Sequence, residues 1–260
     1  MMAPSWLVVL AWIYLAICVC CAALIAYDIF VGGRRQPMGV MNAVFPITAL
    51  YFGPAAVAFY WRWHRTAPRG ITAPARPSRE PSRQAAMATA NGHRPMTMDH
   101  GGSAVPAERE RPWWAMMATE VSHCGSGCVL GDVISEFAIF GLALTIAGSG
   151  LAAEYAGDYV LALAFGIVFQ YFAIAPMRGL GLRDGLIAAA KADFISLTFF
   201  EVGLFGWMAV MTFVLFPAPH ELMPNRAAFW FLMQIGMMVG FATSWPANVW
   251  LVSRGIKIPM

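Results

Sequence analysis

The stretch EVSHCGSGCVLGDVISEF, residues 120–137, gathers most of the side chains that could do chemistry. It holds one imidazole, two thiols and three carboxylates, on His123, Cys124, Cys128, Glu120, Asp132 and Glu136. Thiolate and imidazole ligands suit soft or borderline cations such as Cu(I) and Zn²⁺. The stretch therefore predicts a metal site of His123, Cys124 and Cys128, extended by Asp132 and Glu136.

The spacing of these groups indicates a helix with one polar side. Five of them recur at every fourth residue, namely Glu120, Cys124, Cys128, Asp132 and Glu136. Each step of four turns an α-helix by 400°, so the row drifts by only about 40° per step and extends about 24 Å. A carboxylate near the bilayer centre costs roughly 2.5–3.5 kcal/mol, so this row should face protein or water.

The glycines leave a second geometry open. Gly costs about 1 kcal/mol in a helix interior, and Gly125 and Gly127 flank Ser126. The helix could break there and restart at Cys128, and the exposed backbone amides would then line an ion site. Both geometries bring His123, Cys124 and Cys128 close together.

Two other interpretations of the thiols stay open. Cys124 and Cys128 lie four residues apart, which on a helix places their Cα atoms about 6 Å apart, within disulfide reach. A membrane thiol–disulfide oxidoreductase is therefore the alternative, although no quinone or flavin site is evident. In a structural subunit, the same cysteines would be small packing residues beside Gly127 and Gly131.

The composition requires a bilayer around these residues. Of 260 residues, 59% are apolar and only 12% are charged, against about 25% charged in soluble domains. Crossing a hydrocarbon core takes about 20 apolar residues. We expect an all-α, multi-pass membrane helical bundle with six transmembrane helices, over residues 6–30, 38–61, 127–147, 158–174, 194–216 and 227–251.

Three units follow from the order of these segments. Residues 1–63 form a two-helix transmembrane hairpin, residues 64–112 a disordered cytoplasmic linker rich in Pro, Ala and Arg, and residues 113–260 a four-helix domain. An amphipathic surface segment, 177–193, should precede the fifth helix, with Asp184, Lys191 and Asp193 on its wet face.

The positions of the other charges along the chain predict their surroundings. Glu201 lies within the fifth predicted helix and, with Glu120, would continue a polar path through the membrane. Glu154 and Asp158 are expected to be solvated loop charges. Fourteen of the seventeen Lys and Arg residues fall on one side of the six-helix topology, which predicts both termini in the cytoplasm.

No nucleotide-binding or hydrolase motif occurs in the sequence, so transport is favoured over an enzyme activity. The expected partners are the lipid bilayer, a metal ion (Cu or Zn) and further copies of the chain, with no nucleotide and no nucleic acid.

Two segments carry a resemblance to a known family. SHCGSGCVLGDVISE at 122–136 and SWPANVWLVSRGIKIPM at 244–260 resemble an uncharacterised bacterial family of integral membrane proteins, domain of unknown function 4396. MNAVFPITALYFGP at 41–54 is similar to a helix pair often found ahead of that domain. The resemblance implies a fold unit in a bacterial inner membrane, and it implies no activity.

Overall fold

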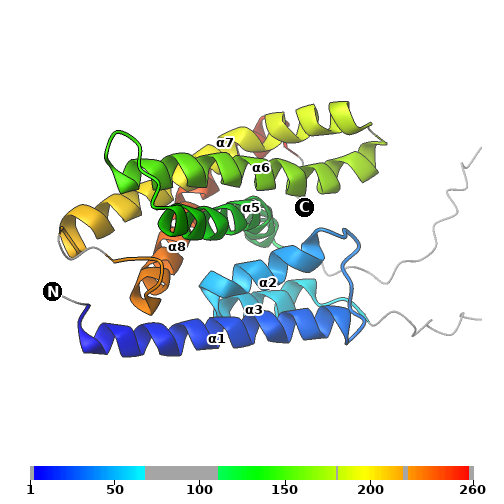
Figure 1. Ribbon diagram of the computed structural model, residues 1–260. Helices are drawn as coiled ribbons and strands as arrows, with labels where there is room; N and C mark the ends of the chain where they lie inside the picture. The colour runs from blue at the N-terminus through cyan, green and yellow to red at the C-terminus, as the bar shows by residue number, and fades with distance from the viewer. Residues whose placement is uncertain (1–2, 68–110, 180, 219–221, 258–260) are drawn as a thin grey trace, which may run out of the picture.

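The protein is an all-α membrane bundle. The computed structural model describes residues 3–67, 111–179, 181–218 and 222–257, and the regular elements in these ranges are helical (Figure 1). Five helical stretches are long and apolar enough to cross a membrane. They are α1 (Ser5–Phe30), α5 (Trp113–Leu142), α6 (Gly150–Arg178), α7 (Leu182–Val210) with the π-helical turn η3 (Met211–Leu215), and α8 (Ala227–Ser253).

The second expected span is wrong, because the chain reverses inside it. Helix α2 (Met41–Phe52) ends at Gly53, whose φ of +54° favours glycine. Pro54 then begins α3 (Pro54–Phe59), and the π-helical turn η1 (Tyr60–His64) follows. A glycine before a helix-starting proline is a turn signal that the sequence carried.

Hydrogen bonds show that this segment returns to the end of the bundle where it started. The Arg34 side chain donates to the Thr66 carbonyl at 2.9 Å, and the Gln36 amide donates to the His64 carbonyl at 3.0 Å. Asp28, in the last turn of α1, also accepts a hydrogen bond from Arg65 at 2.9 Å. Helices α2 and α3 therefore form a re-entrant hairpin that does not cross the bundle.

The hairpin changes the topology of the whole chain. Helix α5 starts beside the end of the hairpin, where Trp114 contacts the ring of Phe59. Helices α5 to α8 then alternate in direction, so the chain after α8 also ends at this side, where Lys257 contacts Glu120 on α5. The six spans, and both termini on one side, are not confirmed. With five long helices, the N-terminus lies at one end of the bundle, which we call the N-terminal end (Figure 1). Lys257 lies toward the other end, the linker end, where it contacts Glu120 near the start of α5.

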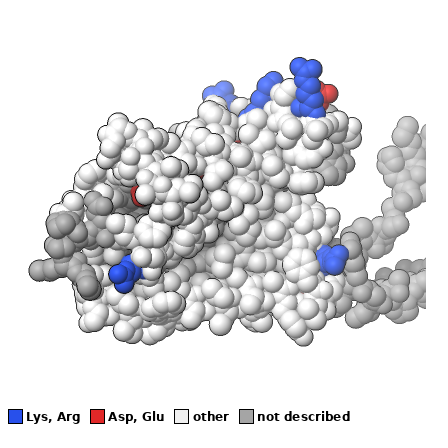
Figure 2. Space-filling model, in the orientation of Figure 1, with Lys and Arg blue, Asp and Glu red and all other residues white. Residues whose placement is uncertain are grey.

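Basic residues are concentrated at the linker end. Within the described ranges, Arg226 is the one Lys or Arg residue that lies at the N-terminal end. Figure 2 shows blue side chains gathered over the projecting ends of α6 and α7. Most of the expected linker, 64–112, lies outside the described residues.

Helix α5 continues without a break through the CGSGC sequence, so the interpretation with a restart at Cys128 is wrong. Tertiary packing outweighs the low helix propensity of glycine here. A Cβ at Gly127 would overlap the backbone of Gly166, and one at Gly131 would overlap the backbone of Ala162. These glycines let α5 and α6 cross at close range, as small residues do in membrane helix pairs.

Three acidic residues lie elsewhere than expected. Glu154, predicted as a solvated loop charge, is half-buried within α6. Helix α7 begins at Leu182 and runs through the predicted surface segment, which buries Asp193 completely. Asp158 lies inside α6 and is also completely buried. Asp184 and Lys191 are exposed, as the wet-face interpretation requires. These predictions fail for one physical reason: α6 and α7 extend beyond the apolar segments from which the membrane spans were predicted.

Candidate functional site

One side of α5 carries its reactive groups into the bundle interior. The five residues of the four-residue repeat are all completely buried: Glu120, Cys124, Cys128, Asp132 and Glu136. The side of α5 opposite this row exposes Ile134, and the last turns of the helix also expose Phe137 and Phe140. The row therefore faces α6, α7 and α8, and we call it, with the groups it meets there, the polar column.

At the linker end, the polar column meets a buried lysine. The Nζ of Lys257 lies 2.7 Å from Asp193 Oδ1 and 2.9 Å from Glu120 Oε1. It also lies 2.8 Å from the Sγ of Cys124 and 3.2 Å from Asn248 Oδ1. We call these five residues the Lys257 cluster. Burial acts to lower the pKa of Lys257, but the charges of Asp193, Cys124 and Glu120 outweigh it and hold this pKa well above its usual value.

The amide of Asn248 is oriented by two serines. Its Nδ2 donates to the Ser196 Oγ at 2.6 Å and to the Ser244 Oγ at 3.0 Å, so its carbonyl oxygen points at the ammonium. Sequence reasoning missed Asp193, Asn248 and Lys257. Asn248, two residues after Pro246 within α8, was the available signal, because an amide inside an apolar helix needs hydrogen-bond partners.

A C-terminal turn delivers Lys257 into the bundle. Gly255 has a φ of +68° and donates from its backbone N–H to the carbonyl of Val252, while Ile256 donates to Leu251. This pair of bonds is a Schellman motif, which ends α8 and reverses the chain. The reversal explains why Lys257, a charge that follows the last helix, is only 3% exposed.

The middle of the polar column is formed by Cys128, Asp132 and Glu201. Glu201 comes from α7 and interacts electrostatically with both Cys128 and Asp132. Tyr51, at the tip of the re-entrant hairpin, packs in the same core as Cys124 and Cys128 and is completely buried. The hairpin thus closes the side of the column next to its two thiols.

Four carboxylates follow toward the N-terminal end: Asp132, Glu136, Asp158 and Glu201, which we call the carboxylate cluster. Asp132 interacts electrostatically with Glu201, Asp158 and Glu136. Each of the four has both carboxyl oxygens buried and without a hydrogen-bond partner in the described residues. Burying one ion costs several kcal/mol, so the cluster requires either protons or a bound cation to be stable.

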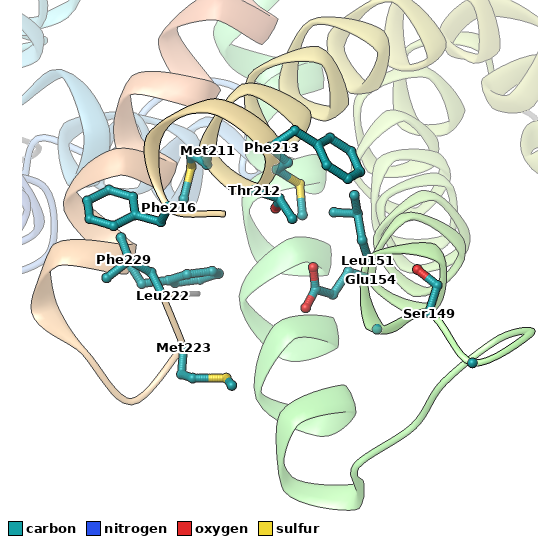
Figure 3. A pocket seen from close by; sticks show the side chains of 13 residues that line it. Ser149, Leu151, Glu154, Met211, Thr212, Phe213, Phe216, Leu222, Met223 and Phe229 are labelled. Carbon is teal, nitrogen blue, oxygen red and sulfur yellow. The ribbon is translucent and has the colours of Figure 1, made fainter. Parts of the chain in front are cut away.

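A cavity of about 410 Å³ opens at the N-terminal end, between α6, η3 and the start of α8. Figure 3 shows the carboxylate of Glu154 in this cavity, among methionine and aromatic side chains such as Met211 and Phe213. Glu154 interacts electrostatically with Glu136 and Asp158. The cavity is therefore coupled to the carboxylate cluster through one residue.

The residues predicted to bind metal are all on or beside the column, but they do not converge on one point. His123 is completely buried near the ring of Phe169, at 6.4 Å between centroids, and neither ring nitrogen has a hydrogen-bond partner in the described residues. Within those residues, no group of three or more His, Cys, Asp or Glu side chains is arranged to hold a metal ion. Cys124 and Cys128 are both free thiols.

The helices and the column define a multi-pass membrane protein with a polar, acidic interior. Residues 113–257 match the family described as domain of unknown function 4396, and the chain belongs to this family. The match begins at α5 and ends at Lys257, so it contains the whole polar column. Comparisons with curated proteins and with solved structures gave no match.

Proposed function

We propose that the protein transports a cation across the membrane along the polar column. The observation that carries this proposal is the carboxylate cluster, four buried acidic side chains that no Lys, Arg or His of the described residues pairs with. Chains of intramembrane acidic residues are typical of ion and proton pathways, because packing alone does not call for them.

The order of groups along α5 supports a continuous path. The Lys257 cluster lies at one end, Cys128 with Asp132 and Glu201 in the middle, and Glu136 with Asp158 beyond them. The cavity next to Glu154 opens at the other end. A cation can pass between neighbouring carboxylates that each hold it only weakly, which conduction requires.

The thiols favour a soft or borderline metal, Cu or Zn, as the cation. Cys124 and Cys128 interrupt a row that is otherwise acidic, and thiolates select such metals over Mg²⁺ or Ca²⁺. His123 lies next in sequence to Cys124 and can add an imidazole once side chains rearrange around the ion.

The charge distribution supports one orientation. The basic linker end lies in the cytoplasm by the positive-inside rule, which places the N-terminus and the cavity next to Glu154 outside. In a bacterium this membrane is the inner membrane. This orientation replaces the one expected from six spans.

The test is cation uptake into proteoliposomes under reducing conditions, with Zn²⁺, Cu(I), Na⁺, K⁺ and H⁺ measured one at a time. We expect Zn²⁺ or Cu(I) uptake by the wild-type protein and its loss in the Cys124→Ser, Cys128→Ser double variant. Cys20→Ser is the matched control, because that thiol is exposed on α1, a helix that contributes no residue to the column. Equal uptake in all three proteins would refute a thiol-dependent metal path.

A further inference from the structure

The cavity at the N-terminal end combines one carboxylate with an apolar, aromatic lining. Its volume of about 410 Å³ falls in the range of about 300–1,000 Å³ that is typical of sites for small organic molecules. Among the described residues that line it, Glu154 is the one charged side chain, and its carboxylate lies in the space (Figure 3). A path for a bare ion does not need a space of this size.

Aromatic and thioether side chains surround this carboxylate. Phe229 and Met211 are buried and form the floor of the cavity, whereas Phe213 and Met223 are exposed and form its rim. The faces of aromatic rings carry partial negative charge and attract cations. Methionine is flexible and polarisable, so it adapts to ligands of varied shape. A lining of this kind favours an apolar ligand that carries a positive charge.

Other classes of ligand fit this cavity less well. An anion would be repelled by Glu154, which also interacts electrostatically with Glu136 and Asp158. A neutral molecule would fill the space but would gain no attraction from the carboxylate. A metal ion needs several converging donors, and in the described residues no group of three or more His, Cys, Asp or Glu side chains is arranged in that way. An organic cation uses both the charge and the apolar lining.

We infer that the cavity binds a lipophilic organic cation, an amine or quaternary ammonium ion with aromatic or aliphatic substituents. The positive group pairs with Glu154, and the substituents pack on Phe213, Phe229 and Met211. A free organic cation and the ammonium headgroup of a lipid share this chemistry. The inference goes beyond the transport proposal and does not depend on it, because binding requires no transport.

The first experiment measures the binding of radiolabelled tetraphenylphosphonium, a lipophilic cation, to the purified protein in a nonionic detergent by equilibrium dialysis. We expect saturable binding to the wild-type protein. Binding to Glu154→Gln should be weaker by about tenfold, which is about 1.4 kcal/mol. Asp184→Asn is the matched control and should bind like the wild type, because Asp184 is exposed at the start of α7 and does not line the cavity.

A variant at the rim keeps the test independent of any folding defect in Glu154→Gln. Phe213 is 69% exposed, so Phe213→Ala should keep the fold and weaken phosphonium binding severalfold. Phe199→Ala should bind like the wild type, because Phe199 is exposed on α7 and does not line the cavity. Tetraphenylborate, an anion of the same shape measured separately, should show no saturable binding. Unchanged phosphonium affinity in either folded cavity variant, or equally tight saturable binding of the anion, overturns the inference.

The second experiment adds a lipid competitor to identify the source of the cation. Phosphatidylcholine carries a quaternary ammonium group, and phosphatidylglycerol with the same acyl chains carries none. Displacement of the phosphonium by phosphatidylcholine alone means that the site takes a lipid headgroup, and displacement by neither lipid means that it takes a free organic cation. Equal displacement by both lipids would mean that acyl chains fill the cavity, which contradicts a cation site.

Discussion

The ammonium nitrogen of Lys257 lies 2.7 Å from Oδ1 of Asp193, although 64 residues separate the two in the chain. The contact joins the tail after α8 to the first half of α7, and both side chains are buried. Replacing one partner of a buried ion pair leaves the other charge uncompensated. The resulting loss in the free energy of unfolding is therefore larger than the net stabilisation that the pair provides.

We therefore predict that Lys257→Met, which leaves two buried carboxylates without a cation, lowers the free energy of unfolding by about 3–5 kcal/mol. Asp193→Asn should cost less, because Glu120 still pairs with the ammonium at 2.9 Å. The double variant should lose less than the sum, because removing the ammonium then leaves one unpaired buried carboxylate, Glu120, instead of two. Unfolding in mixed micelles with increasing SDS measures all four proteins. Additive losses would mean that the two residues do not interact in the folded protein.

A second prediction concerns the close crossing of α5 and α6. Gly131→Ala should destabilise the protein by about 1–3 kcal/mol, because its Cβ would overlap the backbone of Ala162 and the helices would have to separate. Gly141→Ala, on the same helix, is the matched control, since a Cβ there meets no atom within 4 Å. It should be neutral or stabilising by up to about 1 kcal/mol. Equal stability of the two variants in a thermal unfolding assay would contradict this packing.

The third prediction is a pH dependence from His64, at the end of η1 beyond the hairpin. Burial, and secondarily the charge of Arg111, lowers the pKa of His64 to about 3. Its Nε2 is 2.9 Å from the hydroxyl of Thr119 on α5, so the neutral ring joins the hairpin to α5. The unfolded chain binds the proton near pH 6.5, so this stabilisation is complete above pH 6.5 and falls with pH below it.

Thermal unfolding between pH 7.5 and pH 5 measures the effect. As the pH falls below 6.5, the free energy of unfolding of the wild-type protein should decrease by up to about 1.4 kcal/mol per pH unit more than that of His64→Gln. The reason is that the glutamine amide does not titrate. His64→Gln keeps a group that can bond to Thr119. Parallel pH profiles for the two proteins would show that His64 is protonated in the folded state or is not docked.

The fourth prediction concerns the topology. Because α2 and α3 form a hairpin that does not cross the bundle, a tag before Ser5 and a tag after the last residue should lie on opposite sides of the membrane. Protease added to intact cells stripped of the outer envelope should remove the N-terminal tag and spare the C-terminal one. Protection of both tags from the protease would contradict this topology and indicate six membrane spans instead.

Parts of the fold follow from local sequence pattern, and parts depend on contacts that no local pattern encodes. The all-α bundle and the row of Glu120, Cys124, Cys128, Asp132 and Glu136 along α5 follow from apolar length and a period of four residues. These features are properties of single helices, so the sequence is sufficient for them.

Asp158, Asp193 and Lys257 could not be placed in this way. Each lies near the end of an apolar segment, where a charge is usually solvated, and each is buried only because another helix covers it. The Gly53–Pro54 dipeptide predicts a turn, but the apolar segment 38–61 is also long enough for a complete membrane span. The two signals conflict, and the sequence alone does not decide between them.

The central claim is that a cation moves along the carboxylate cluster. It is tested most directly by Zn²⁺ and Cu(I) uptake into proteoliposomes containing Asp132→Asn, Glu201→Gln or the exposed-site control Asp184→Asn, at matched protein content. We expect uptake by the wild-type protein and Asp184→Asn, and a loss of tenfold or more, about 1.4 kcal/mol, in each of the other two variants. Unchanged uptake in folded Asp132→Asn and Glu201→Gln would contradict the account, because the path would then lie outside the polar column.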